Sequence, residues 1–265
     1  MSLRIQNNVE ALGAHRHLTD TSSAISKSME RLSSGFRINR AADDAAGLAI
    51  SERMRAQTRG LAQTNRNIQD GVSLVQTAEG NLDEVHSMLQ RVRELAVQYK
   101  NGTLSASDQA AIQTEVNQLA SEIERIGSSA KFNGITLLAA SGTVTFQVGV
   151  NDNDAITVST ISLGSSVGTF STLSGANAIS LIDAAITAVS SARSTFGAVQ
   201  NRLEHSLTAN AVYRENLVAA ESRIRDVDMA AEMVELTKNQ ILQQAGTSML
   251  SQANQSSQGV LSLLR

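Results

Sequence analysis

The longest feature of this sequence is a helical pattern that scarcely breaks between Ile179 and Met249. At 1.5 Å per residue, an unbroken helix over that stretch would be about 105 Å long, whereas a compact globule of this chain length has a radius of gyration of about 18 Å. The helix cannot fit inside such a globule. Either the chain forms one elongated bundle with its termini side by side, or the helix breaks near residues 224–228 into two stacked units.

Apolar residues recur at seven-residue spacing in four stretches, and further apolar residues three or four positions away complete each seam. This alternation is typical of coiled-coil packing, and because the sequence contains no proline, the helices can run without kinks. We therefore predict a mainly α fold, an elongated antiparallel helical bundle in which the N- and C-terminal helices pair as a coiled coil. The repeats are Ala11, Leu18, Ile25 and Leu32; Ile68, Val75, Leu82, Leu89 and Ala96; Ile112, Val116, Leu119, Ile123 and Ile126; and Ile182, Val189, Phe196, Leu203, Leu217 and Ile224.

Local signals mark the ends of the predicted helices. Asn-Gly pairs at 101–102 and 133–134 are strong turn signals. Ser105 together with Asp108 predicts a capping box at the start of the third helix, in which each residue satisfies a backbone N–H of the other.

The strand-like residues lie between the third and fourth helices. β-branched side chains alternate partly over residues 143–148 and 155–161, and the segment between them has the residues of a turn. We predict one small β-hairpin near residues 142–161, followed by a loop rich in Ser, Thr and Gly over residues 162–175.

The end of the sequence carries no charged side chain from Asn239 to Leu264. This stretch is too rich in Gln, Asn and Ser to be a membrane-spanning helix, which needs about 20 predominantly apolar residues. It is also too poor in charge for an ordinary surface helix. We interpret it as a segment whose apolar and amide side chains face other copies of this protein.

The overall composition narrows the class of protein. A net charge of −3 gives no basic surface of the kind that binds nucleic acid. The absence of cysteine and proline leaves no disulfide and no slow proline isomerisation, which would suit a chain that is moved unfolded and folds later. Residues 1–10 lack the apolar core of a cleaved secretory signal. Neither nucleic-acid binding nor membrane insertion is expected.

The sequence offers little for catalysis. It has no His-Glu-x-x-His, no phosphate-binding Gly-x-x-x-x-Gly-Lys-Ser/Thr and no Gly-x-Ser-x-Gly. His15 and His17 diverge on a helix, and His86 and His205 stand alone, so we interpret all four as surface or interface residues. No enzyme activity, metal or cofactor is predicted.

Two acidic clusters have simpler explanations than catalysis or metal binding. Adjacent carboxylates at Asp43 and Asp44 would point apart on a helix, and Arg37 and Arg40 are nearby, which favours a helix start or a salt link between subunits. Residues 152–154 lack the remaining ligands of a calcium loop and are better explained as a hairpin turn.

Several longer motifs point to one family. Residues 32–48 read LSSGFRINRAADDAAGL and are followed by Ala-Ile-Ser-Glu, which closely resembles the N-terminal signature of bacterial flagellin. One departure is Ser256-Ser257, where the family often has a proline. Further matches are NRNIQDG at 65–71, LQRVRELAVQ at 89–98, FNG at 132–134, QANQ at 252–255 and VLSLL at 260–264.

The resemblance implies a domain organisation and a function. Residues 1–43 with 226–265 would form an inner terminal coiled-coil domain, and residues 44–225 a helical bundle with the hairpin, with no separate outer domain. The protein would be the structural subunit of the flagellar filament, exported unfolded with the help of a flagellin chaperone, secreted without signal cleavage, and polymerised as a helical homo-polymer beneath the filament cap. The alternative is a hook–filament junction protein, which shares the terminal design. An enzyme carried on such a scaffold would need an inserted domain for which the chain has no room.

Assembly contacts are expected at both ends of the chain, where the helices have apolar seams or unusual charge clusters. The residues expected to make them are Ile25, Leu32, Arg37, Arg40, Asp43 and Asp44 near the N-terminus, and Ile241, Met249, Leu250, Leu261 and Leu264 near the C-terminus.

The resemblance also implies an immune recognition site. Arg91, Leu95 and Glu115 match residues by which some flagellins contact the Toll-like flagellin receptor of vertebrates, and Gln90 and Glu94 lie beside them. Leu95 is one position beside the seam, next to charged residues, so we expect it to be an exposed apolar anchor. A contact within the bundle or between subunits is the alternative, and both could hold for the same surface.

Overall fold

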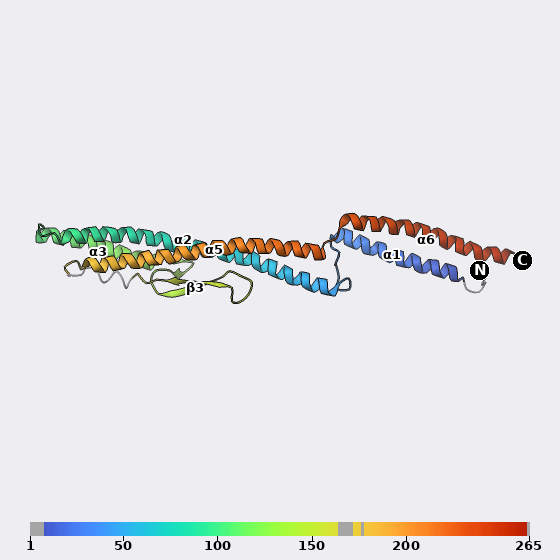
Figure 1. The fold of residues 1–265 in the computed structure, drawn as a ribbon, viewed down its shortest axis with the longest axis horizontal. Coiled ribbons are helices and arrows are strands. Elements are labelled where there is room, and N and C mark those ends of the chain that lie inside the picture. The colour runs from blue at the N-terminus through green and yellow to red at the C-terminus, as the bar shows by residue number, and fades with distance from the viewer. Residues whose placement is uncertain (1–7, 164–171, 176–177, 264–265) are drawn as a thin grey trace. The chain divides into compact units, whose positions relative to one another are not determined.

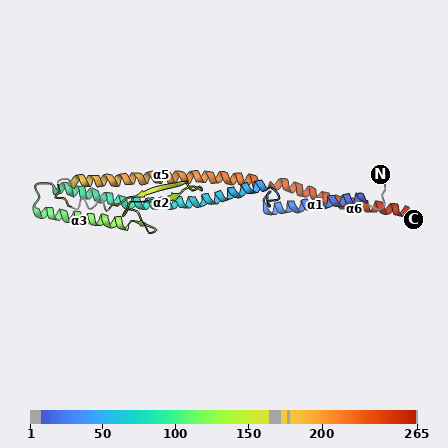
Figure 2. The same ribbon diagram turned by 90° about the horizontal axis from the view of Figure 1, so that it is seen from below.

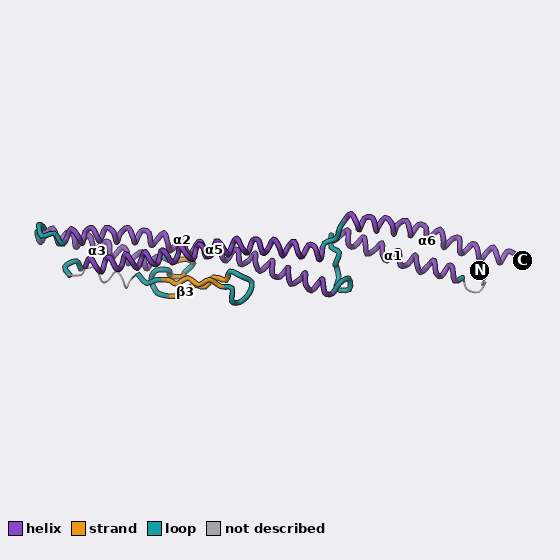
Figure 3. The backbone as a smooth tube through the Cα atoms, in the orientation of Figure 1, coloured by secondary structure: helices purple, strands orange, loops and turns teal. Residues whose placement is uncertain are grey.

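The computed structural model describes residues 8–163, 172–175 and 178–263, with side chains in the last helix described up to residue 255. The described residues are mainly α-helical, as predicted, with two small β-hairpins (Figure 1, Figure 3). The helices are α1 (Val9–Ser34), α2 (Ala45–Tyr99), α3 (Ala106–Ser129), α5 (Ala178–Arg225) and α6 (Met229–Leu263), and the strands are β1 (Lys131–Phe132), β2 (Ile135–Thr136), β3 (Gly142–Gln147) and β4 (Ala155–Thr160).

The long C-terminal helical pattern is interrupted once. α5 ends at Arg225 and α6 begins at Met229, so the helix breaks near residues 224–228, as one of the two alternatives expected. The side chain of Asp228 accepts hydrogen bonds from the backbone N–H groups of Ala230 and Ala231, at 2.9 and 3.2 Å. This is the geometry of an N-cap, and it explains why a new helix starts here.

The chain forms two compact units. The first contains residues 1–56 and 216–265, and the second contains residues 57–215. α2 and α5 continue from one unit into the other without a break in the helix. The first unit therefore includes residues 44–56 and 216–225, with the first turns of α2 and the last turns of α5, which the division at residues 43 and 226 assigns to the other domain.

The second unit has a continuous hydrophobic core. α2, α3 and α5 bury their heptad seams against one another, and the β3–β4 hairpin covers part of the same core with Ile156 and Val158. The strands pair antiparallel with Val144 opposite Val158, so the predicted hairpin is confirmed. The fully buried seam residues include Ile68, Val75, Leu82, Val116, Ile123, Ile182 and Leu203.

The helix ends and turns follow the local signals. The Ser105 hydroxyl accepts from the Asp108 N–H at 3.3 Å and the Asp108 carboxylate accepts from the Ser105 N–H at 3.2 Å, which confirms the capping box. At the predicted turn, Asn133 and Gly134 both have positive φ, 47° and 82°, as two-residue hairpin turns require. Here they join β1 to β2, a small hairpin that the turn signal alone did not predict.

The first unit contains the predicted pairing of the two terminal helices. α1 and α6 lie side by side (Figure 2) and run antiparallel, since the Asn8 side-chain amide donates to the Ala253 carbonyl at 2.9 Å while Arg31 pairs with Glu232 at 3.4 Å. α1 ends at Gly35, whose φ of 75° is left-handed and suits glycine at this position.

The seam of this helix pair is covered less completely than the core of the second unit. The heptad residues of α1, Ala11, Leu18, Ile25 and Leu32, are half-buried. Leu236 of α6 is buried, and two polar residues, Ser28 of α1 and Asn239 of α6, are buried as well.

Candidate functional site

The outer side of the α1–α6 pair carries many exposed apolar side chains. Two helices can cover only the sides that face each other, so apolar residues elsewhere on either helix remain in contact with solvent. Ile241 and Met249, both predicted to make assembly contacts, belong to this surface. Its members are Val9, Leu12, Met29, Met229, Met233, Val234, Ile241, Leu242 and Met249.

Apolar residues occur all round α6. Leu236 is buried, while Val234 and Ile241 are exposed on the opposite side of the helix, as the 100° rotation per residue requires. A helix that is apolar on every side is normally buried on every side. The surface of α6 therefore has the composition of a helix with more than one neighbour.

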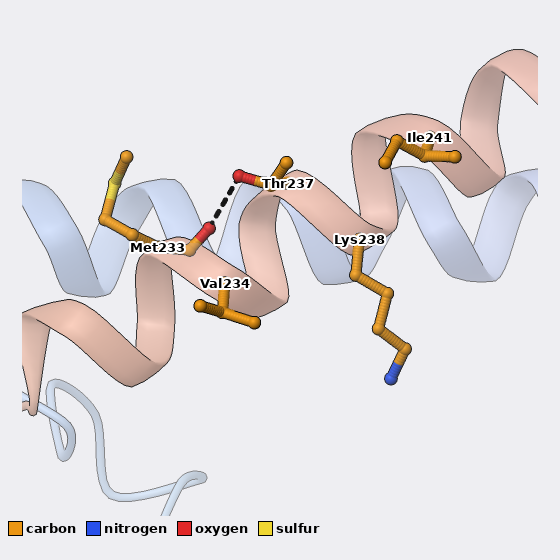
Figure 4. Close-up of a pocket in the computed structure, with 5 residues that line it drawn as sticks. All are labelled: Met233, Val234, Thr237, Lys238 and Ile241. Atoms are coloured by element: carbon orange, nitrogen blue, oxygen red, sulfur yellow. Dashed lines mark hydrogen bonds between the residues drawn. The ribbon is translucent and has the colours of Figure 1, made fainter.

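Figure 4 shows the middle of this surface, a shallow depression formed by α6 alone. It is lined by Met233, Val234, Thr237, Lys238 and Ile241. The Thr237 hydroxyl donates to the Met233 carbonyl at 2.8 Å. The Lys238 ammonium pairs with Glu235 at 3.3 Å and is the last charged group of the helix before the charge-free stretch.

The other predicted assembly residues of the terminal helices differ in exposure. Ile25, Leu32 and Leu250 are half-buried. Leu250 lies four residues after Gly246, which approaches Leu18 of α1, so it belongs to the side of α6 that faces α1. Leu261 has no described side chain and Leu264 lies outside the described residues.

A second set of candidate residues joins the loop after α1 to the break between α5 and α6. The Arg37 N–H donates to the Arg225 carbonyl at 2.7 Å, and the Val227 N–H donates to the Gly35 carbonyl at 3.0 Å. These bonds place Phe36 and Asp226 in an antiparallel β-bridge. Backbone hydrogen bonds therefore link the loop after α1 to the break between α5 and α6.

Arg225 is the central side chain of this junction. Its guanidinium lies 4.6 Å from the centre of the Phe36 ring and donates to Glu52 at 2.7 Å, and the side chain is only 11% exposed. The hydrogen bond from Arg225, followed by that from Arg55, lowers the pKa of Glu52. Arg37 donates to the Ile224 carbonyl at 2.6 Å, which satisfies an acceptor at the end of α5.

The signature acids lie in the same junction, in two different roles. Asp44 accepts from the Gly47 N–H at 2.8 Å and starts α2, so the helix-start interpretation is confirmed for this residue. A side chain at Gly47 would collide with Asp44, because an added Cβ would lie 2.4 Å from its carboxylate.

Asp43 instead holds the loop to α1. Its carboxylate pairs with the Lys27 ammonium at 2.7 Å and accepts from the backbone N–H groups of Asn39 and Arg40. The hydrogen bond from Lys27 is the largest cause, and with the backbone bonds it lowers the pKa of Asp43 to about 2. Arg40 pairs with Glu30 at 2.9 Å, so neither acid is paired with a signature arginine side chain.

The predicted receptor residues lie on α2 and α3 and form a surface network. Arg91 pairs with Glu115 at 3.0 Å and with Glu94 at 3.2 Å, and all three side chains are about half exposed or more. The hydrogen bond that Arg91 donates to Glu115, followed by the one that it donates to Glu94, raises the pKa of Arg91. Gln90 is exposed and hydrogen-bonds to His86 at 2.9 Å.

The expectation that Leu95 is an exposed anchor is wrong. Its side chain is 2% exposed and belongs to the core of the second unit, with Val92 and Ala96. α2 contributes to a core that also contains residues of α3 and α5, so the buried stripe of α2 is wider than a coiled-coil seam of two positions per heptad. Leu95 falls inside that wider stripe.

Sequence reasoning missed the residues that hold the junction together, above all Phe36, Glu52 and Arg225. They come from three distant segments and share no periodic pattern. The available signal was the basic end of α5, since arginine in a last helical turn often binds free carbonyls or nearby acids.

Among the described residues, no group of His, Cys, Asp and Glu is arranged to hold a metal ion. None of the helices in the described part of the chain is long and apolar enough to cross a membrane.

Comparisons with known proteins place both ends of the chain in one family. The model of the bacterial flagellin N-terminal helical region matches residues 5–143, and that of the C-terminal helical region matches residues 179–264. Flagellin of Halalkalibacterium halodurans is 53% identical over 270 residues, which cover 98% of this chain and 99% of that protein. The flagellar filament 33 kDa core protein of Treponema phagedenis is 49% identical over 284 residues, covering 98% and 99% of the two chains.

A solved flagellin structure also matches this chain. The crystal structure of Bacillus cereus flagellin matches with a TM-score of 0.51 and 32% identity, over 55% of this chain and 88% of that chain. Matches of this length and identity, at both ends of the sequence and over whole relatives, show that the chain belongs to the bacterial flagellin family.

Proposed function

We propose that this flagellin is the structural subunit of an extracellular flagellar filament and that it self-assembles through the α1–α6 pair. The observation that carries the proposal is the distribution of apolar residues all round α6 in a unit that covers only one side of it. A second copy is the occupant that fits best, because relatives that match over nearly their whole length include a flagellar filament core protein. The charge-free stretch after Lys238 can be buried without leaving an unpaired charged side chain in the interface.

Assembly by repetition of one contact explains the form of the polymer. Identical head-to-tail contacts that do not close into a ring produce a helical filament. Such a tube would transmit motor rotation as thrust. A chain without cysteine or proline suits export in an unfolded state, and the apolar side of α6 is a surface that an export chaperone would have to cover beforehand. The filament cap and the hook–filament junction proteins are the expected neighbours at the two ends of the polymer.

Electron microscopy and sedimentation of the purified chain test this proposal. The chain should form long tubes, whereas a hook–filament junction protein should form only short rings. Ile241→Lys should abolish polymerisation, because each subunit would bury an ammonium with no acid beside it, at a cost of several kcal/mol (about 3–5). The matched control is Ser121→Lys, at an exposed position of α3, which should polymerise more readily than Ile241→Lys. Long, stable filaments from Ile241→Lys would refute burial of this face.

We also propose recognition by the Toll-like flagellin receptor through the network of Arg91, Glu94 and Glu115, with Gln90 beside it. The supporting observation is that two acids hold the Arg91 guanidinium at the surface, and a preorganised arginine is a common binding hot spot. Leu95 supports this surface from the core and is not itself a contact. Arg91→Asp should abolish signalling by soluble monomer, while Arg125→Asp on α3 should leave it unchanged. Undiminished signalling by Arg91→Asp would overturn the assignment.

A further inference from the structure

The methionines of this chain are unevenly exposed. Met229, Met233 and Met249 of α6 are 49%, 50% and 64% exposed, and Met29 of α1 is 54% exposed on the same surface. Met54 and Met88 of α2 are half-buried, and Met88 packs against the core of the second unit. The accessible thioethers of α6 therefore lie on the surface through which the chain is proposed to polymerise.

We propose that Met29, Met229, Met233 and Met249 form an oxidation-sensitive site that controls whether the α1–α6 pair can be buried against another copy. The proposal rests on the proposed filament function. The oxidant is a peroxide. The thioether sulfur attacks one peroxide oxygen, the O–O bond breaks as the S–O bond forms, the sulfur loses two electrons, and the second oxygen leaves as water after taking up the protons.

Oxidation of these methionines makes the apolar surface of the α1–α6 pair more polar. A methionine sulfoxide is polar where the thioether was apolar, and burying its oxygen without a hydrogen-bond donor is unfavourable. At 100° per residue, Met229 and Met233 lie about 40° apart around α6 and Met249 lies about 160° from Met233, so oxidation would place polar groups on more than one side of the helix.

The neighbouring hydroxyl groups are already engaged. Thr237 donates to the Met233 carbonyl, Ser248 donates to the Gln244 carbonyl, and Ser251 donates to the Ser248 carbonyl. A sulfoxide at Met233 or Met249 would have to compete with the helix backbone for these donors. Oxidised subunits should consequently fail to assemble, whereas subunits already in a filament should be shielded from the oxidant by their neighbours.

The experiment treats soluble monomer and preformed filaments with dilute hydrogen peroxide. Peptide mass spectrometry then follows oxidation at each methionine, and sedimentation with electron microscopy follows polymerisation. In the monomer, Met29, Met229, Met233 and Met249 should oxidise several-fold faster than Met88, and the oxidised protein should lose the ability to sediment as filaments. In filaments the same four residues should be protected. Reduction by methionine sulfoxide reductases A and B should restore assembly.

The control is Met29→Leu/Met229→Leu/Met233→Leu/Met249→Leu, which keeps similar apolar volume and removes the sulfurs of this surface. Its circular dichroism verifies folding, and it should polymerise both before and after peroxide treatment. Equal loss of assembly in this variant, or full assembly of oxidised wild type, would overturn the inference. If untreated wild type does not polymerise, the filament proposal fails. The order of oxidation rates in the monomer still decides whether the α1–α6 pair holds the reactive methionines, because uniform rates would overturn that assignment independently.

Discussion

The two units use the same heptad pattern and reach different degrees of burial. In the second unit, three helices and a hairpin enclose the seam, and Val75, Leu82 and Val116 have no exposed surface. In the first unit, α1 and α6 have only each other, and Leu18 and Ile25 stay half-buried. The heptad pattern thus specifies which side of a helix is apolar and packs against a partner. It does not specify how many partners the free chain supplies.

Hydrogen exchange on the monomer is the sharpest test of this difference. The amides of α1 and α6 should exchange through local opening, while those of α2 between residues 61 and 96 should exchange only near global unfolding. Opening free energies range from about zero to the global value of about 5–15 kcal/mol, so protection should differ by orders of magnitude. Equal protection in both units would show that the helix pair needs no further partner.

Matched core truncations give the next largest effect. Leu82→Ala should destabilise the monomer by about 2–5 kcal/mol, because it leaves a cavity in an enclosed core. Leu18→Ala removes the same atoms from a half-open seam and should cost clearly less in the monomer. Thermal unfolding followed by circular dichroism compares the two. The comparison breaks down if Leu18→Ala is as destabilising as Leu82→Ala.

Removing the central side chain of the junction should have a smaller, local effect. Arg225→Ala abolishes the contact with the Phe36 ring, worth about 1–2 kcal/mol when partly desolvated. Exchange of the Arg37 and Val227 amides, which bridge the junction, should accelerate by about tenfold for each 1.4 kcal/mol lost. Arg223→Ala, an exposed neighbour, is the control. Unchanged exchange in Arg225→Ala would mean that the backbone bonds suffice.

The smallest effect concerns pH. Asp43 has a pKa of about 2 in the folded chain against its ordinary value of 3.8, so its stabilisation is present above pH 3.8 and is lost as pH falls toward 2. An NMR titration should find this low pKa in the monomer, and Lys27→Met should raise it toward the ordinary value. A titration that is the same in wild type and Lys27→Met would show that Lys27 is not the cause.

The sequence predicted the elements whose causes are local or periodic. The heptad seams, the capping box at Ser105, the β3–β4 hairpin and the break after Arg225 all follow from spacing or from turn and cap chemistry. The exposure of Leu95 was mispredicted because the width of a buried stripe depends on how many elements pack on the helix. The junction around Arg225 was missed because its partners are distant in sequence. The assembly and receptor contacts remain predictions, since they lie between molecules.

The buried polar residues in the α1–α6 seam affect the register in which the two helices pair. A heptad pair can slip by one repeat, about 10 Å along the helix axis, and still bring apolar residues together. Ser28 and Asn239 are buried, and polar residues at such positions penalise slipped pairings, which is how coiled coils select a register. Each copy would then present the same outline to the next. In a polymer, alignment errors of one heptad would accumulate, and these two polar residues would keep the repeat distance uniform.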